Sequence, residues 1–270
     1  ALGFARGPHR TELRRREHRG PLRVQRPFHP EPGGTCHVYV LHPPGGIVGG
    51  DTLALDIEAA AAAHALVTTP GAAKFYRSAG ATATVEQRLA IGADAVLEWL
   101  PQETLYFDGA RARVRTTVTL ARAATFIGWD ITCLGRPAAG AAFRSGAIDA
   151  RVEIHDVHAG ASRPRLLERL CFAPAGAAAA PGWHGCAATG TLYAAGPALD
   201  AAGGRVPDDV QELVGAFAGP AGVTIVDDVL ACRALAPDAL TLRSLFQAVW
   251  TLLRPQLLGR PAVIPRIWHT

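Results

Sequence analysis

Residues 111–120 read RARVRTTVTL, and this stretch determines the fold class that the sequence predicts. From Ala112 to Leu120 every second residue is apolar or threonine, while the residues between them are arginine or threonine. Side chains alternate between the two faces of a β-strand, so this pattern predicts a strand with one face in a core and the other toward solvent. Residues 52–57, TLALDI, alternate in the same way and predict a second such strand.

Most of the chain before residue 235 has the same character. Short apolar or alternating runs predict further strands at residues 35–42, 65–69, 82–91, 95–99, 125–133, 150–157, 166–172 and 222–230. The Asp108-Gly109 pair lies between residues 104–107 and the run that begins at Arg111. Asp-Gly between two strand-like runs is a strong hairpin signal, so the sequence predicts that these two strands pair.

Two segments near the C-terminus have helical spacing instead. Residues 208–217 predict a short helix that begins with two aspartates, which suit the positive end of the helix dipole. Residues 237–253 predict a longer amphipathic helix, because their apolar residues recur every three or four positions. Asp238 can cap this helix at its start, and Pro255 should end it near Arg254.

Stretches rich in alanine, glycine and proline predict loops at residues 173–185 and 194–207. We therefore expect a single domain over residues 1–270. Its β body extends to about residue 235 and contains the helical insertion near 208–217, and a C-terminal helix and tail follow from about 237 to 270. The predicted fold class is mainly β.

The composition is that of an ordinary soluble globular protein. The 27 lysines and arginines outnumber the 23 acidic residues, which gives a net charge of +4, and 49% of the residues are hydrophobic. No uninterrupted apolar stretch reaches the length of about 18 residues that a membrane span needs. The five cysteines include no C-x-x-C pair. We therefore expect a cytoplasmic protein with reduced thiols.

Motifs of common enzymes and ligand-binding proteins are missing from the sequence. The glycine-rich loop at residues 42–51, HPPGGIVGGD, has the spacing of neither a dinucleotide fingerprint nor a P-loop. There is no G-x-S-x-G, and His155 and His158 would lie on opposite faces of a strand, which does not suit a shared metal ion. Seven arginines between residues 10 and 26 favour a solvated strand face, because no nucleic-acid motif accompanies them.

These residue patterns alone predict a soluble, mostly β, cytosolic protein and assign it no function. Two alternatives stay open on the same residues. One is a hydrolase-like enzyme that uses the glycine-rich loop as a substrate cradle, although no nucleophile, base or cofactor motif is identifiable. The other is an arginine-rich nucleic-acid-binding protein, which would bind DNA or RNA with a steep salt dependence.

Several segments, taken together and in order, resemble one protein family, the urease accessory protein family UreD, called UreH in some organisms. The segments are HRGPLRVQRP at 18–27, the loop at 42–51, TTPGAAKFYRS at 68–78, EWLPQE at 98–103 with Asp108-Gly109, and LRPQLLGRPAVIPRIW at 253–268. They span nearly the whole chain. The resemblance, and the lack of any methionine, lead us to expect that the family's first strand begins a few residues before Ala1.

The resemblance implies a β-helix-like body of stacked β layers, with two helices near the C-terminus, and a non-enzymatic role in assembly. The implied partners are UreF, an all-helical protein, UreG, a GTPase that brings nickel, and the urease apoprotein subunits. Together they load nickel into urease. No tightly bound cofactor is expected, only transient Ni²⁺, and neither nucleic acid nor a membrane is an expected partner.

A nickel ion in transit must be held firmly enough to enter the protein and weakly enough to leave it. Carboxylates, carbonyls and water suit that compromise better than a cage of histidine and cysteine. We therefore expect a polar passage through the β layers, lined in part by Asp51, Glu98, Glu103 and Asp108. For Asp51 and Asp108 the alternative is a turn residue, because Gly-Asp and Asp-Gly are common in turns.

The C-terminal helix and tail predict a surface for a partner. Their arginines and last tryptophan are residue types that anchor protein interfaces, and the resemblance assigns this surface to UreF. The candidate contact residues are Arg254, Arg260, Arg266 and Trp268. The alternative is that Trp250, Leu253 and Ile267 pack onto the β core, and both interpretations can hold for opposite faces.

Overall fold

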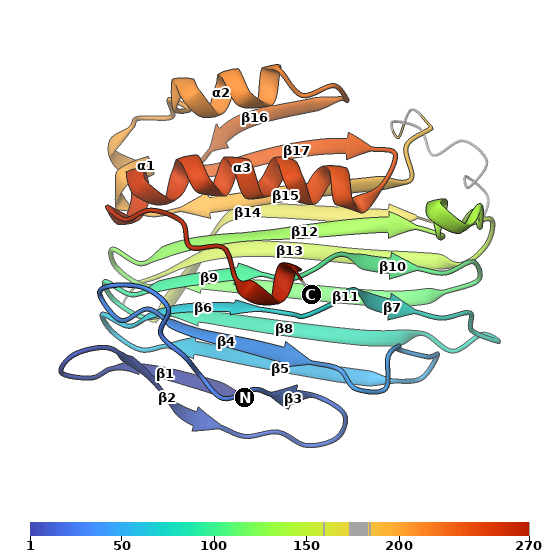
Figure 1. The fold of residues 1–270 in the computed structure, drawn as a ribbon, viewed down its shortest axis with the longest axis horizontal. Coiled ribbons are helices and arrows are strands. Elements are labelled where there is room, and N and C mark those ends of the chain that lie inside the picture. The colour runs from blue at the N-terminus through green and yellow to red at the C-terminus, as the bar shows by residue number, and fades with distance from the viewer. Residues whose placement is uncertain (159, 173–182, 184, 270) are drawn as a thin grey trace.

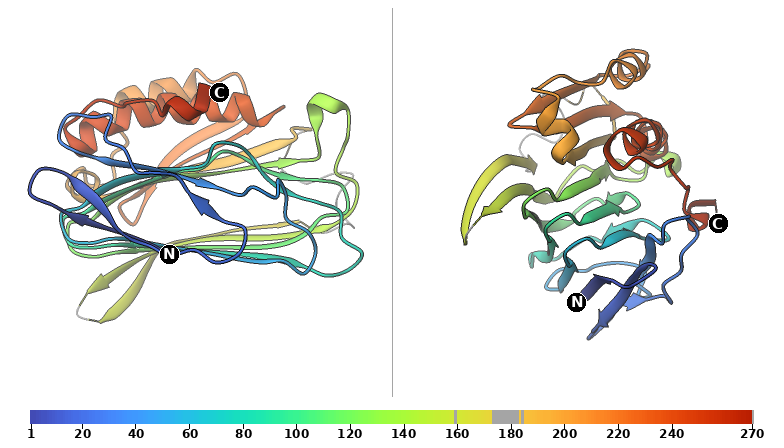
Figure 2. Two further views of the ribbon diagram at one scale, coloured as in Figure 1. Left: turned by 60° about the horizontal axis from the view of Figure 1, so that its bottom comes forward. Right: turned by 90° about the vertical axis from the view of Figure 1, so that its left-hand side faces the viewer.

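The computed structural model describes residues 1–158, 160–172, 183 and 185–269, which form two β-sheets stacked face to face (Figures 1 and 2). The middle of the larger sheet consists of parallel strands β4 (Cys36–Leu41), β6 (His64–Thr68), β9 (Val96–Leu100) and β12 (Thr125–Leu134). The middle of the other sheet consists of parallel strands β5 (Thr52–Ala59), β8 (Ala83–Ile91), β11 (Arg111–Leu120) and β13 (Ala147–His158). The chain passes back and forth between the sheets, so each circuit adds a strand to both. The predicted β-helix-like, mainly β fold is confirmed.

Further strands extend the stack at both ends. At one end lie β1 (Leu2–Arg6), β2 (Thr11–Arg16) and β3 (Arg23–Val24). At the other end lie the antiparallel strands β14 (Ala161–Phe172), β15 (Ala188–Ala195), β16 (Ala221–Val226) and β17 (Val229–Ala236). Two short strands, β7 (Ala73–Phe75) and β10 (Thr104–Tyr106), pair with each other beside β12.

The predicted hairpin at Asp108-Gly109 is wrong. Strand β10 pairs in parallel with β7 and β12 in the larger sheet, whereas β11 lies in the other sheet between β8 and β13. Asp108-Gly109 is therefore a corner where the chain changes layers, and Gly109 has the positive φ of 81° that such a sharp turn favours. A turn signal predicts a change of direction, but it does not say which strand becomes the neighbour.

A tight hairpin occurs instead where one strand was expected, at residues 222–230. Strands β16 and β17 pair antiparallel around Asp227 and Asp228. Both aspartates have positive φ values, 47° and 60°, as both central residues of a type I′ hairpin turn require. Two aspartates without a glycine are a weak sequence signal for that turn.

The two predicted helices are present as α2 (Asp208–Gly215) and α3 (Ala239–Leu258). Asp238 caps α3, since its carboxylate accepts a hydrogen bond from the Thr241 N–H at 2.8 Å. Pro255 does not end the helix, which continues for another turn to Gly259, where φ is 65°. A proline so near the end removes only one helical N–H donor, and the buried apolar face of α3 holds the last turn in place.

A short helix, α1 (Pro197–Ala201), lies inside the predicted loop at 194–207. Most of the predicted loop at 173–185 lies outside the described residues.

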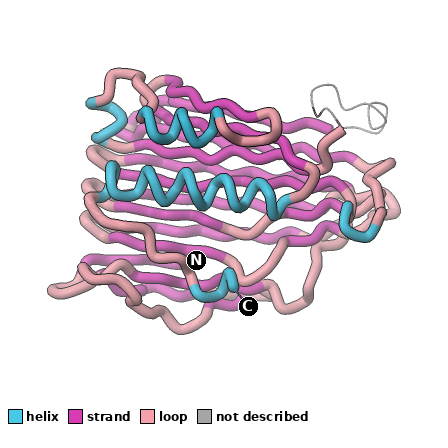
Figure 3. Tube along the Cα trace, turned by 45° about the horizontal axis from the view of Figure 1, so that its top comes forward, coloured by secondary structure: helices cyan, strands magenta, loops and turns pink. Residues whose placement is uncertain are grey.

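Helix α3 covers the outer face of the larger sheet (Figure 3). One apolar core lies between the sheets, a second lies between the larger sheet and α3, and a third groups residues of β7, β10, β11 and β13. Among the described helices, none has the length and apolarity to cross a membrane.

Candidate functional site

The second core contains a buried ion cluster, formed by Glu31, His37, His64, Glu98 and Arg254. The Glu98 carboxylate accepts hydrogen bonds from Arg254 Nε at 3.0 Å and from Trp250 Nε1 at 2.7 Å. His64 Nε2 lies 2.8 Å from Glu98 Oε1. The other guanidinium edge of Arg254 donates to both Glu31 oxygens at 2.8 and 2.7 Å, and His37 Nε2 lies 2.5 Å from Glu31.

Strand geometry explains how these groups meet. His37, Leu66 and Glu98 are register partners on β4, β6 and β9, so their side chains form one row under α3. Alternation predicts that Glu98 lies on the face opposite Leu97 and Trp99, and this is confirmed, because those two residues belong to the core between the sheets. Trp250 and Arg254 are one helical turn apart on α3 and both reach the row.

The cluster keeps both of its carboxylates ionised. Burial alone would raise the pKa of Glu98, but the hydrogen bond to His64 and the charges of His64 and Arg254 outweigh it and lower that pKa to about 2. Burial also opposes ionisation of Glu31, whose pKa is nevertheless lowered by His37 and Arg254. Each carboxylate already has close donors, so the cluster is built to hold α3 against the sheet.

Two predicted site residues belong to this cluster. Both Glu98 and Arg254 are completely buried. Glu98 therefore lies under α3 instead of between the β layers, where the passage was expected. Arg254 does not reach the surface, so its guanidinium cannot contact a partner protein in this conformation. Its burial corrects the prediction that placed Arg254 on a partner surface.

A cavity of about 260 Å³ lies between the two sheets. Apolar side chains form much of its wall, and polar groups from both sheets interrupt it. Gln87 on β8 accepts a hydrogen bond from Thr116 on β11 at 3.1 Å, and Asp130 lies opposite, on β12. Among its lining residues, Gly45 and Gly71 are exposed, so the cavity reaches the surface beside the glycine-rich loop at 42–51 and the Pro70-Gly71 turn.

Asp130 is the acidic residue of the cavity wall. Burial raises its pKa to about 6, and the nearby charge of Glu168 adds to the shift. Asp130 is the register partner of Thr191, whose hydroxyl donates to Glu168 across the gap at 3.0 Å. Thr191 and Glu168 do not line the cavity, but their hydrogen bond links the larger sheet to β14 of the other sheet beside Asp130.

Sequence reasoning missed Asp130. The only signal is a single acidic residue in an otherwise uncharged strand, TFIGWDITCL at residues 125–134. Alternation around Trp129 would have placed Asp130 on the inner face, but the sequence does not show that a cavity is left there. A cavity depends on how well the side chains of two sheets fill the space between them.

The other three predicted carboxylates lie apart from the cavity wall. Asp51 accepts the Val48 N–H at 3.0 Å within its own turn. Asp108 accepts the N–H groups of Arg144 and Ser145, each at 2.8 Å, and these bonds lower its pKa. The contact of Asp51 is a turn role, whereas Asp108 ties its corner to residues 144 and 145 of another segment.

Glu103 forms an ion pair with Arg243 of α3 at 3.5 Å. Together with Asp51, Glu98 and Asp108 it was expected to line a passage, yet none of the four is among the residues that line the inter-sheet cavity. The structure therefore does not bring them together in one passage. Their role as transient nickel ligands stays a prediction.

The C-terminal tail lies across the sheet and α3. Trp268 is half-buried, its ring lies 5.7 Å from that of Trp129 and 5.9 Å from that of Trp250, and its Nε1 donates to Thr68 at 2.9 Å. Arg260 is half-buried and Arg266 is exposed. The tail thus packs on the body through Trp268 and leaves Arg266 accessible to a partner.

Among residues 1–158, 160–172, 183 and 185–269, no three His, Cys, Asp or Glu side chains converge in a way that would hold a metal ion. The described site is therefore a mainly apolar internal space with a few polar groups and one carboxylate of raised pKa.

Comparisons with known proteins agree on one family. A family model described as UreD urease accessory protein matches residues 1–269. The chain is 45% identical over 277 residues to the urease accessory protein UreD of Dechloromonas aromatica strain RCB, which covers 100% of this chain and 93% of that relative. It is 45% identical over 271 residues to the UreD of Pseudomonas putida strain W619, covering 100% and 92%. It is 42% identical over 271 residues to the UreD of Klebsiella aerogenes, covering 100% and 95%.

Proposed function

The chain belongs to the UreD urease accessory protein family, and from this premise we propose that it is a non-enzymatic scaffold for nickel insertion. In this role it bridges urease apoprotein to UreF and UreG. GTP hydrolysis is left to UreG, in line with the missing P-loop in this sequence. We propose that the chain itself catalyses no reaction and offers nickel, the cargo of the complex, an internal route.

The observation that carries the proposed route is the inter-sheet cavity with Asp130 in its wall. A carboxylate, an amide oxygen and hydroxyls are oxygen ligands that Ni²⁺ exchanges readily, unlike a closed set of thiolates and imidazoles. Asp130 would supply the attractive charge, and Gln87 and Thr116 would replace part of the hydration shell. The apolar remainder of the wall offers no ligand, so the ion is not trapped.

The experiment that tests this function is co-purification of the tagged chain with UreF, UreG and the urease subunits, followed by metal analysis of the urease. We expect all four components in one complex, and nickel in urease only when this chain is present. Urease that acquires the same nickel content in cells lacking the chain would refute the proposal. Turnover of a substrate by the purified chain alone would favour the hydrolase alternative.

The tail gives a separate prediction about UreF. Arg266 is exposed, so we expect Arg266→Glu to weaken UreF capture by about tenfold while the melting temperature of the chain is unchanged. Trp268→Ala should instead lower stability by about 2 kcal/mol, because it removes two ring contacts and a hydrogen bond. Pull-down and thermal unfolding of both variants measure the two effects, and unchanged UreF capture by Arg266→Glu would exclude Arg266 from the interface.

A further inference from the structure

The charge of this protein is concentrated in its first 30 residues. They hold eight of the 27 basic residues but only two of the 23 acidic residues, which gives a net charge of +6. The remaining 240 residues carry a net charge of −2, so the +4 of the whole chain comes from this segment. A field of one sign on one surface attracts partners of the opposite sign.

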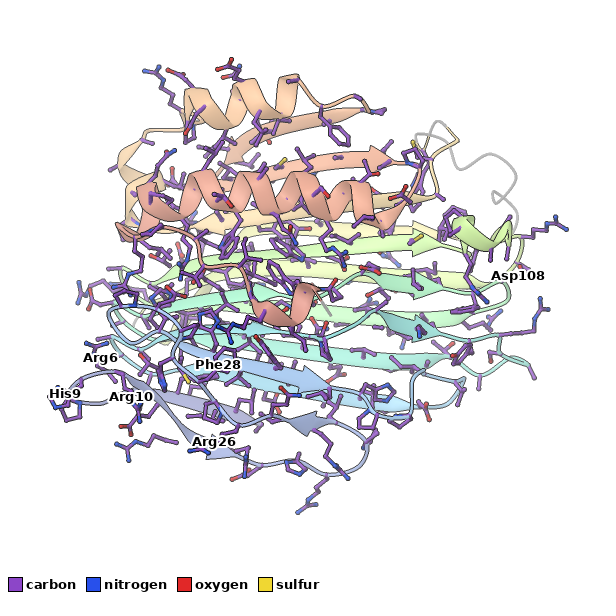
Figure 4. The ribbon with its side chains drawn as sticks, viewed as in Figure 1. Arg6, His9, Arg10, Arg26, Phe28 and Asp108 are labelled. Carbon is purple, nitrogen blue, oxygen red and sulfur yellow. The ribbon has the colours of Figure 1, made fainter. Side chains whose placement is uncertain are left out.

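The fold places this segment at one end of the stack. Among the described strands, β2 is the last strand of its sheet and β3 is the last strand of the other. Figure 4 shows Arg6, His9, Arg10 and Arg26 gathered there, in the part of the molecule opposite the α2 end. Charged side chains on an edge strand also prevent unwanted pairing between sheets, but that role needs only charge and no particular arrangement.

Three arginines from different segments converge on the Gly33–Gly34 turn. Arg6 donates to the Gly33 carbonyl at 3.4 Å. A Cβ at Gly33 would lie 3.1 Å from the guanidinium of Arg260, and one at Gly34 would lie 2.5 Å from the Arg10 side chain. Both glycines have positive φ, which disfavours larger residues, and at Gly34 the nearby Arg10 backbone leaves no room for a side chain either.

These arginines have no counter-charge of their own among the described residues. Arg6, Arg10, Arg26 and Arg260 form no ion pair within 4 Å there, whereas Glu12, the carboxylate beside Arg10, pairs with Arg14 at 2.6 Å. The guanidinium groups of Arg6 and Arg260 both approach Gly33, and like charges on one surface repel, so an external anion would stabilise them. Guanidinium matches a carboxylate particularly well, because it can donate two parallel hydrogen bonds.

Arg10 and Arg26 also line a surface hollow together with Glu12 and His29, and its apolar part is formed by Leu13, Pro27 and Phe28. Phe28 is held by ring contacts with His37 and Tyr39, so its position is set by the body of the protein. An apolar hollow beside arginines fits a peptide with an apolar side chain flanked by carboxylates. Nucleic acid would use the charge but offers no side chain for the hollow.

We propose that this arginine edge, formed by Arg6, Arg10, Arg26 and Arg260 with its hollow, is a docking site for an acidic protein segment. The segment presents glutamates or aspartates to the guanidinium groups and places one apolar side chain against Leu13 and Phe28. The proposal stands on the charge distribution and the local geometry of this chain, and it does not depend on the nickel route.

The test uses a labelled glutamate-rich peptide with one central leucine as the probe, and fluorescence anisotropy as the measurement. We expect binding that weakens markedly as NaCl rises from about 50 to about 300 mM, because the contacts lie at the surface. Arg10→Glu with Arg26→Glu should lower the affinity by about tenfold or more. The matched control is Arg111→Glu with Arg113→Glu, which makes the same charge change at two exposed arginines on β11 and should bind like the wild type.

Four results would overturn the proposal. They are no binding by the wild type, equal losses in both double variants, equal binding of a peptide with glycine in place of leucine, and tighter binding of a thymidine oligonucleotide than of the peptide. Circular dichroism establishes that the variants are folded. Arg26→Gln, which keeps a long polar side chain, provides a milder variant if the double substitution fails to fold.

Discussion

Replacing Arg254 with methionine is expected to destabilise this protein by about 3–5 kcal/mol, which is a large part of the stability of most domains. Arg254 is the cation between Glu31 and Glu98, and all three side chains are buried. Without the guanidinium, two carboxylates remain in the core with no fixed positive charge between them. Urea unfolding followed by circular dichroism measures the change.

A matched control is available at the surface. Arg88 also bridges two carboxylates, those of Asp56 and Glu86, but its side chain is 59% exposed. Arg88→Met should therefore leave the unfolding midpoint almost unchanged, because water already solvates exposed charges. Equal losses from Arg254→Met and Arg88→Met would contradict the role of burial.

Removing the two carboxylates together with Arg254 should restore much of the stability. In the triple variant Arg254→Met, Glu31→Gln, Glu98→Gln, no charge is left unpaired in the core, although the acceptors of His37 and His64 become neutral amide oxygens. A triple variant that is less stable than Arg254→Met would show that hydrogen bonding, and not charge, dominates the cluster.

The same cluster predicts acid sensitivity. The folded-state pKa values of Glu31 and Glu98 are lowered, so both groups stabilise the native state above their ordinary pKa of 4.5. This contribution is lost as pH falls from about 4.5 toward about 2, where Glu98 takes up its proton. The free energy of unfolding should fall over this window in the wild type and more weakly in the triple variant.

Replacing Asp130 with asparagine is expected to separate function from stability. We expect the nickel content of co-expressed urease to fall by about tenfold or more, the scale on which losing a metal-contacting group lowers metal binding. The stability of the chain should stay the same or rise at neutral pH. Burial raises the pKa of Asp130 to about 6, so its charged form destabilises the fold above that pH, and asparagine removes this cost.

The control for Asp130 is Asp56→Asn on β5, which removes an acidic residue whose side chain is 50% exposed. It should leave nickel delivery unchanged. The wild type should also deliver less nickel to urease below about pH 6, because Asp130 becomes protonated there. The nearby charge of Glu168 adds to the rise in the pKa of Asp130. Full urease loading by Asp130→Asn, at equal yield of the complex, would remove Asp130 from the route.

Local patterns in the sequence were enough to predict most strands, the helices α2 and α3, and the capping role of Asp238. They succeeded there because strand alternation, helical spacing and capping depend on neighbours within a few residues. Where the outcome depends on distant residues, they failed. The Asp108-Gly109 corner reads locally as a hairpin, and Pro255 reads as a stop, yet sheet pairing and the packing of α3 overrode both signals.

The candidate site shows the same division. The position of Glu98 on its strand was predictable from Leu97 and Trp99, but its partner Arg254 is 156 residues away in the sequence. Asp130 was not identified, because its importance comes from the space left between two sheets. By itself the sequence determined the mainly β class, the family resemblance and which neighbouring residues of a strand share a face. Only the tertiary structure decided which charges meet in the core and where a cavity remains, since both depend on segments that the chain brings together from far apart.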